Sequence, residues 1–303
     1  MPPSVLVVTG ILSLQLGAGL AGRTFGEAGA AGITGLRLWW AAAILAAVGG
    51  RGLAAAVRAV VRDRAWTDLL VVVTFGVVLG IMNFSIYQSF ARIPLGVAVT
   101  IEFLGPLAVA VASSRRLVDA AWVALAGAGV ALLTSGGSLT RGMAGHGTGT
   151  AVAGVAFGLT AAACWAAYIL LSRSVGRRFS GSSGLVIAML VAAVVVTPSA
   201  IASGGGRLAH PGVIAAGLAI GLLSSVIPYR VEMEALRQVP ARIFGIWMSL
   251  EPAVAALVGL IVLGESLAWS QWLAIVCVTV ACAGAARGRP APGRDPAAST
   301  LTP

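Results

Sequence analysis

Long, nearly uninterrupted apolar stretches make up most of this chain, and short polar segments separate them. A helix that spans a bilayer needs about 20 apolar residues. Ten stretches come close to that length: 4–22, 30–49, 69–89, 93–114, 119–136, 150–172, 183–202, 212–235, 241–264 and 268–286. The pattern therefore predicts an all-α polytopic membrane protein with ten transmembrane helices.

Composition agrees with a membrane protein and excludes a soluble one. Only 10% of the 303 residues are charged and 58% are hydrophobic, with a mean hydropathy of +0.97. Soluble domains carry about 25% charged residues. The net charge of +10 does not indicate a nucleic-acid partner, because the arginines are scattered among short loops between apolar runs.

The arginines also predict the orientation of the chain in the membrane. Alternate loops and the C-terminal segment carry fourteen arginines, whereas the opposite set of loops carries four. Cytoplasmic loops are enriched in basic residues. The split predicts a multi-pass protein with both termini in the cytoplasm.

An internal duplication is visible around two pairs of prolines. Pro94 and Pro240, like Pro106 and Pro252, are separated by 146 residues. Since each half would hold five spans, an odd number, the second half enters the membrane from the opposite side, which is an inverted repeat. The predicted units are a first repeat at 1–136, a glycine-rich connector at 137–149, a second repeat at 150–286 and a disordered cytoplasmic tail at 287–303.

These repeated stretches resemble a known family. ARIPLGVAVTIEFLGPLAVA at 91–110 and LRQVPARIFGIWMSLEPAVAA at 236–256, with LGESL at 263–267, are similar to the EamA-type branch of the drug/metabolite transporter superfamily. Within it they look like bacterial threonine/homoserine exporters. The resemblance implies two inverted five-helix repeats, with helices 1–4 and 6–9 around a central cavity.

Two carboxylates lie near the middle of apolar spans. Glu102 is about nine residues into the span 93–114, and Glu251 is about ten residues into the span 241–264. Acidic groups are costly in lipid and mark functional sites by default. Either one could exchange a proton or pair with a substrate ammonium, and the alternative is a protonated carboxyl bonded between helices.

Polar residues of the span 69–89 are the next candidates for substrate contact. Asn83 and Tyr87 share one helix face because they are four residues apart, and Gln88 lies beside that face. Such residues suit a substrate with hydroxyl, amine or carboxylate groups. The alternative role is hydrogen bonding between helices.

Two arginines inside spans complete the candidate substrate site. Arg37 could hold a substrate carboxylate or extend its head group to the membrane surface. Arg230 could act at a gate or on a substrate carboxylate, and it can pair with Glu234 one turn later.

No motif indicates catalysis, a cofactor or a metal. The two histidines lie in predicted loops, and the absence of lysine excludes a Walker A motif. The sequence therefore predicts a gradient-driven exporter of small polar metabolites. The resemblance implies the bacterial inner membrane as its location and amino acids such as threonine or homoserine as its substrates. Its expected partners are that small molecule, the lipid bilayer and, as one option, protons; a homodimer is left open. The alternatives are an exporter of another amphipathic metabolite or drug, and an integral-membrane enzyme.

Overall fold

The computed structural model describes residues 2–62, 66–112, 117–134, 148–179 and 183–287, and every regular element in these ranges is a helix. The predicted all-α class is therefore confirmed. The predicted tail beyond residue 287 and all but the end of the predicted connector lie outside the described residues. The elements of the first part are α1 (Pro3–Arg62), α2 (Trp66–Phe90), α3 (Leu95–Glu102), α4 (Leu104–Ala112) and α5 (Leu117–Thr134).

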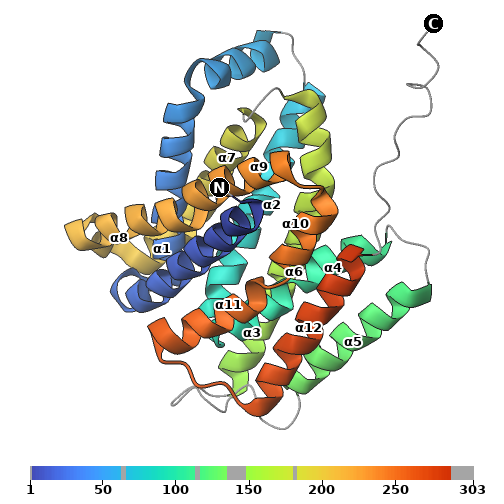
Figure 1. Ribbon diagram of the computed structural model, residues 1–303. Coiled ribbons are helices and arrows are strands. Elements are labelled where there is room, and N and C mark those ends of the chain that lie inside the picture. Colours follow the sequence, from blue (N-terminus) through green and yellow to red (C-terminus); the bar gives the residue numbers. More distant parts are fainter. Residues whose placement is uncertain (1, 63–65, 113–116, 135–147, 180–182, 288–303) are drawn as a thin grey trace, which may run out of the picture.

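The second part of the chain contains more short helical segments than the first (Figure 1). It comprises α6 (Thr148–Arg178), α7 (Ser183–Gly204), η1 (Gly205–Ala209), α8 (Pro211–Gly221), η2 (Leu222–Val226), α9 (Ile227–Gln238), α10 (Ala241–Met248), α11 (Glu251–Val258), η3 (Gly259–Leu263) and α12 (Trp269–Arg287). The segments η2 and η3 are π-helical.

Eight helices among the described residues are long and apolar enough to cross a membrane, and a shorter apolar helix covers Ala120–Leu133. One of the eight, Pro3–Val48 in α1, has 46 residues. At 1.5 Å per residue it would be about 70 Å long if straight, more than twice the bilayer's apolar thickness of about 30 Å.

Helix α1 does not run straight, and its bend accounts for that length. The α1 ribbon changes direction sharply in Figure 1. Gly29 has φ +72°, a left-handed conformation that residues with a Cβ rarely adopt. The bend at Gly29 lies between the two spans, 4–22 and 30–49, that the sequence predicts here.

The two proline-flanked segments share one backbone conformation. Pro94 precedes α3 with φ −54° and ψ 142°, and Pro240 precedes α10 with φ −58° and ψ 141°. Each proline begins an eight-residue helix that ends at a matching cap, Phe103 or Ser249, also 146 residues apart. A second short helix follows each cap, so both apolar spans are broken near their middle.

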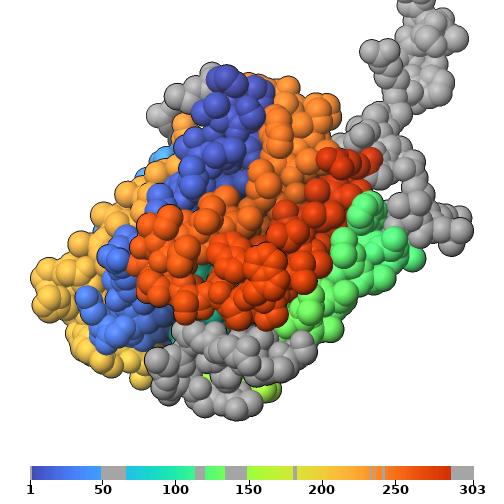
Figure 2. All heavy atoms as spheres, turned by 60° about the horizontal axis from the view of Figure 1, so that its bottom comes forward, coloured from blue at the N-terminus to red at the C-terminus, as the bar shows by residue number. Residues whose placement is uncertain are grey.

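Small residues allow the helices to pack closely, as is usual in membrane bundles. A Cβ on Gly96 of α3 would lie 2.6 Å from the backbone of Ala256 in α11, and one on Gly105 of α4 would overlap the carbonyl of Ala162 in α6. Helices α5 and α12 lie side by side at one edge of the bundle (Figures 1 and 2). Close contacts therefore join the first part of the chain to the second at several places.

Candidate functional site

A cavity of about 290 Å³ lies between helices of both parts of the chain. Small-molecule sites occupy about 300–1,000 Å³, so this cavity suits a small ligand. Its walls include apolar side chains such as Leu14, Met82 and Trp165. The polar residues that line it are Gln15, Arg37, Asn83, Tyr87, Glu102, Tyr168, Ser224, Ser225, Tyr229, Glu232 and Glu251.

Arg37 is the cation of this cavity, and α1 holds it there with only 4% of its surface exposed. Its Nη1 donates hydrogen bonds to the hydroxyls of Ser224 (3.0 Å) and Ser225 (3.3 Å) in η2. Its Nη2 donates to Oδ1 of Asn83, whose own amide donates to the backbone of α2. The guanidinium also lies 4.6 Å from the ring centre of Tyr87. These contacts fix the arginine in place through neutral groups.

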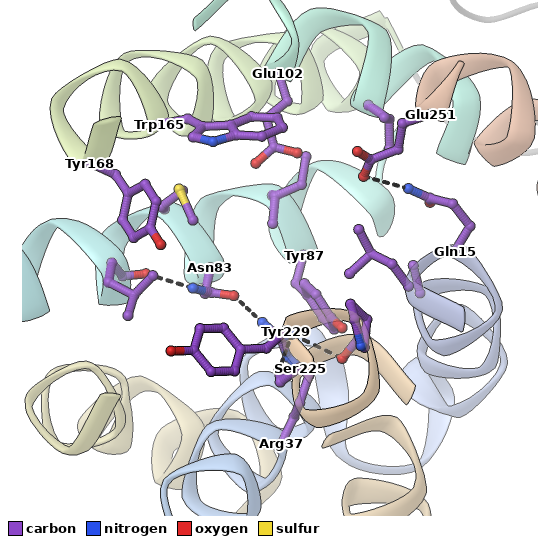
Figure 3. A pocket seen from close by; sticks show the side chains of 18 of the residues that line it. Gln15, Arg37, Asn83, Tyr87, Glu102, Trp165, Tyr168, Ser225, Tyr229 and Glu251 are labelled. Carbon is purple, nitrogen blue, oxygen red and sulfur yellow. Dashed lines mark hydrogen bonds between the residues drawn. The ribbon is translucent and has the colours of Figure 1, made fainter. Parts of the chain in front are cut away.

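Carboxyl groups occupy other walls of the same cavity. Glu102 is the last residue of α3 and Glu251 is the first residue of α11. Each therefore lies next to the break between the two short helices of its span. The Gln15 amide donates a 3.0 Å hydrogen bond to Oε1 of Glu251. Figure 3 shows Glu102 and Glu251 at one side of the pocket and Arg37 at the other. The cavity therefore has an acidic side and a basic side.

The cavity unites five of the seven residues that the sequence predicts as substrate-binding. Arg37, Asn83, Tyr87, Glu102 and Glu251 all line it.

The other two predicted site residues lie away from the cavity wall. Gln88 is buried, and both its backbone oxygen and its Oε1 accept hydrogen bonds of 2.6 Å from Nη1 of Arg92. Arg230 is exposed. Glu234, its suggested partner, instead lies 3.6 Å from Nη1 of Arg237 and accepts a hydrogen bond from Gln238.

Sequence reasoning missed several polar residues of the site. Ser225, Tyr229 and Glu232 line the cavity at positions i, i+4 and i+7, the same spacing that singles out Asn83 and Tyr87. This shared face could have been found from the sequence. Gln15 had no such signal, because the residues three and four positions to either side of it are apolar or glycine.

Nothing in the described ranges groups three or more His, Cys, Asp or Glu side chains in a way that could hold a metal ion. Cys164, Cys277 and Cys282 are all unpaired thiols. The polar groups that line the cavity include hydrogen-bond donors, acceptors and charged groups, which are the kinds of groups that can bind a small charged molecule.

Comparison with known proteins places this arrangement in a family. The model of the EamA-like transporter family matches residues 152–287. The threonine/homoserine exporter RhtA of Escherichia coli K12 is 40% identical over 93% of this chain and 90% of its own length. This chain belongs to the EamA-like transporter family. The RhtA of Salmonella typhimurium LT2 is 38% identical over the same shares of the two chains.

Two further relatives are more distant. The uncharacterized transporter YwfM of Bacillus subtilis is 30% identical over 53% of this chain and 52% of its own length. A protein of known crystal structure shares 19% identity, with a TM-score of 0.59 over 93% of this chain and 95% of its own. That likeness shows the same fold. The family membership identifies the chain as a multi-pass membrane transporter and not an enzyme.

Proposed function

We propose that this chain exports amino acids, with threonine and homoserine among them, across the bacterial inner membrane as a secondary transporter. The two-sided charge of the cavity carries the proposal. Arg37 would receive the substrate carboxylate, and Glu102 and Glu251 would receive its ammonium. The identity with RhtA exporters over most of the chain supports the substrate class.

The state of Arg37 is the most specific support for a bound carboxylate. The guanidinium is buried and hydrogen-bonds to neutral oxygens. In the part of the chain that the structure describes, no carboxylate lies within ion-pair distance of it. A buried cation is costly unless it is paired. A substrate carboxylate would complete the coordination of Arg37, and this requirement selects an anionic or zwitterionic substrate.

The membrane arrangement that we propose has ten crossings in two inverted repeats. The fold-back of α1 at Gly29 supports two crossings within that helix, and Ala120–Leu133 supplies another. The broken spans α3–α4 and α10–α11 support the inverted repeat, because transporters use broken helices beside a midplane substrate site. The arginine distribution favours cytoplasmic termini.

A proton gradient across the membrane would supply the energy for export. Glu102 and Glu251, the proposed ammonium site, are carboxyl groups that line the cavity. A proton and a substrate ammonium would therefore compete for the same carboxyl groups. Such competition couples the outward movement of substrate to the inward movement of protons.

Substrate counterflow in proteoliposomes tests the proposed function. Vesicles loaded with unlabelled threonine should accumulate labelled threonine through the parent protein. Arg37→Gln should lose most of this accumulation, whereas Arg177→Gln, at an exposed position, should retain it. If the parent moves no amino acid but extrudes amphipathic dyes, the chain is a drug exporter and the proposal is wrong.

A further inference from the structure

Four buried polar atoms around the cavity have no hydrogen-bond partner within the described structure. They are Arg37 Nε, Gln15 Oε1, Tyr87 Oη and Glu251 Oε2. The only other such atom found among the described residues, Thr279 Oγ1, belongs to α12 and does not line the cavity. Buried polar atoms are normally paired, so a cluster of unpaired ones in one cavity indicates groups that a ligand completes.

The four atoms differ in whether they can donate or accept a hydrogen bond. Arg37 Nε can only donate a hydrogen bond, and the oxygens of Gln15 and ionised Glu251 can only accept one. A phenol such as Tyr87 can do both. The carboxylate of an amino acid needs donors and its ammonium needs acceptors. Arg37, Gln15 and Glu251 therefore match the groups that all amino acids share, and Tyr87 remains for a group that can both donate and accept.

We propose that Tyr87 is a specificity-determining residue that hydrogen-bonds the side-chain hydroxyl of the substrate. The inference rests on the proposed function, since it takes an amino acid to be the ligand. It adds the selection of hydroxylated amino acids over apolar ones of equal size.

The ring of Tyr87 is held so that its hydroxyl has a fixed position. Its centre lies 6.1 Å from that of Phe25 and 5.4 Å from that of Phe90. The Arg37 guanidinium covers the ring at 4.6 Å from its centre, and the side chain is only 3% exposed. The group that would bind the substrate carboxylate therefore touches the residue that would bind the hydroxyl.

This arrangement gives selectivity through the cost of an unpaired group. Threonine would pair with the Tyr87 hydroxyl, whereas valine, which has a methyl in place of the hydroxyl, would leave it unpaired. Sites built to bind a substrate hydroxyl discriminate strongly against analogues that lack it. The same reasoning applies to homoserine and its isostere norvaline.

Calorimetric binding to the purified protein tests the role of Tyr87. The parent should bind threonine more tightly than valine, and homoserine more tightly than norvaline. In Tyr87→Phe, the affinity for threonine should fall about tenfold while that for valine stays unchanged, so the preference largely disappears. Tyr229→Phe removes another hydroxyl from the same cavity, one that is not among the unpaired buried atoms, so it should keep the preference for threonine over valine even if the affinity for both changes.

Each contrary result has a distinct meaning. The inference is wrong if the parent binds threonine and valine equally, if Tyr87→Phe keeps the preference, or if only Tyr229→Phe removes it. A marked fall in the melting temperature of Tyr87→Phe also overturns it, because that hydroxyl would then have a protein partner. If the parent binds no amino acid at all, the proposed function itself fails.

Discussion

The carboxyl of Glu265 accepts a 2.9 Å hydrogen bond from the backbone N–H of Leu95, 170 residues earlier in the chain. Leu95 is the first residue of α3, and Pro94 before it provides no side-chain cap. Glu265 follows Gly264, whose φ of +70° ends η3 and turns the chain. A residue from the end of one broken span thus caps the beginning of the other, and it links the two parts of the chain.

Glu265 should make stability depend on pH. Burial raises the pKa of its carboxyl from 4.5 to about 7, and this outweighs the hydrogen bond from Leu95, which lowers the pKa. The folded protein therefore holds this proton more tightly than the unfolded chain does. Stability from this group is complete below about pH 4.5 and is lost as the pH rises through about 7.

Melting temperatures measured across this pH range check the prediction. Glu265→Gln cannot titrate, so its profile should be flatter than that of the parent. Glu27→Gln, at an exposed position of α1, should keep the profile of the parent. Parallel profiles for the parent and Glu265→Gln would show that Glu265 does not titrate in this interval.

The contact between Gly105 and Ala162 should tolerate no added methyl group. A Cβ at Gly105 would collide with the backbone carbonyl of Ala162, and backbone cannot move aside as a flexible side chain can. Gly105→Ala should therefore lose about 1–3 kcal/mol of stability. Gly127→Ala, where the new Cβ would meet nothing within 4 Å, should gain about 0.5–1 kcal/mol from helix propensity. Chemical denaturation measures the free energy of unfolding of both variants. Equal values for Gly105→Ala and Gly127→Ala would contradict the close packing at Gly105.

Asn83 and Tyr87 should be reachable from water through the cavity. In a protein whose three native cysteines are replaced, Asn83→Cys and Tyr87→Cys should react with a membrane-impermeant thiol reagent, and substrate should slow the reaction. Val194→Cys is the control, because this exposed apolar residue of α7 should face lipid. Inertness of both cavity cysteines under all conditions would place residues 83 and 87 in a closed helix interface.

Reporter fusions test the proposed orientation. A fusion after Arg64 should report the cytoplasm and one after Ser203 the opposite side, because an odd number of crossings separates them in the ten-span arrangement. The same location for both reporters would rule out that arrangement.

Much of the fold could be predicted from hydrophobic pattern alone, because lipid imposes a simple length rule on helices. The matched breaks near the middle of two spans also agree with the sequence, since Pro106 and Pro252 each lack the N–H that a continuous helix needs. The alignment of site residues in the first part of the chain with those in the second was harder to predict from the sequence. The pairs Gly76–Gly80 and Gly217–Gly221 are 141 residues apart, whereas Pro94 and Pro240 are 146 residues apart. The π-helical turn η2 lies within this interval of the second part, between Gly221 and Pro240.

The residues predicted from the cost of charge in an apolar span line the cavity, whereas the prediction was incomplete where a helix face had to be chosen. Arg37 and Glu102 stand out because charge in an apolar span needs a reason. Arg230 and Glu232 are two residues apart in α9. Arg230 was chosen from the sequence because it lies one turn before Glu234 and could pair with it. The structure exposes Arg230 and turns Glu232 to the cavity, because the rotation of α9 follows from its packing against other helices and not from its own sequence.

In the proposed transport cycle, one cavity binds the substrate between Arg37 and carboxyl groups that also take protons. Counterflow of labelled threonine by Glu102→Gln, measured from mild acid to mild alkali, tests it most directly. The variant keeps the shape and hydrogen bonding of the side chain but cannot ionise. We expect Glu102→Gln to insert normally and to keep its melting temperature, but to lose most transport and its pH dependence, while Glu27→Gln behaves like the parent. Transport by Glu102→Gln equal to that of the parent at every pH would show that Glu102 neither binds the substrate ammonium nor carries the proton.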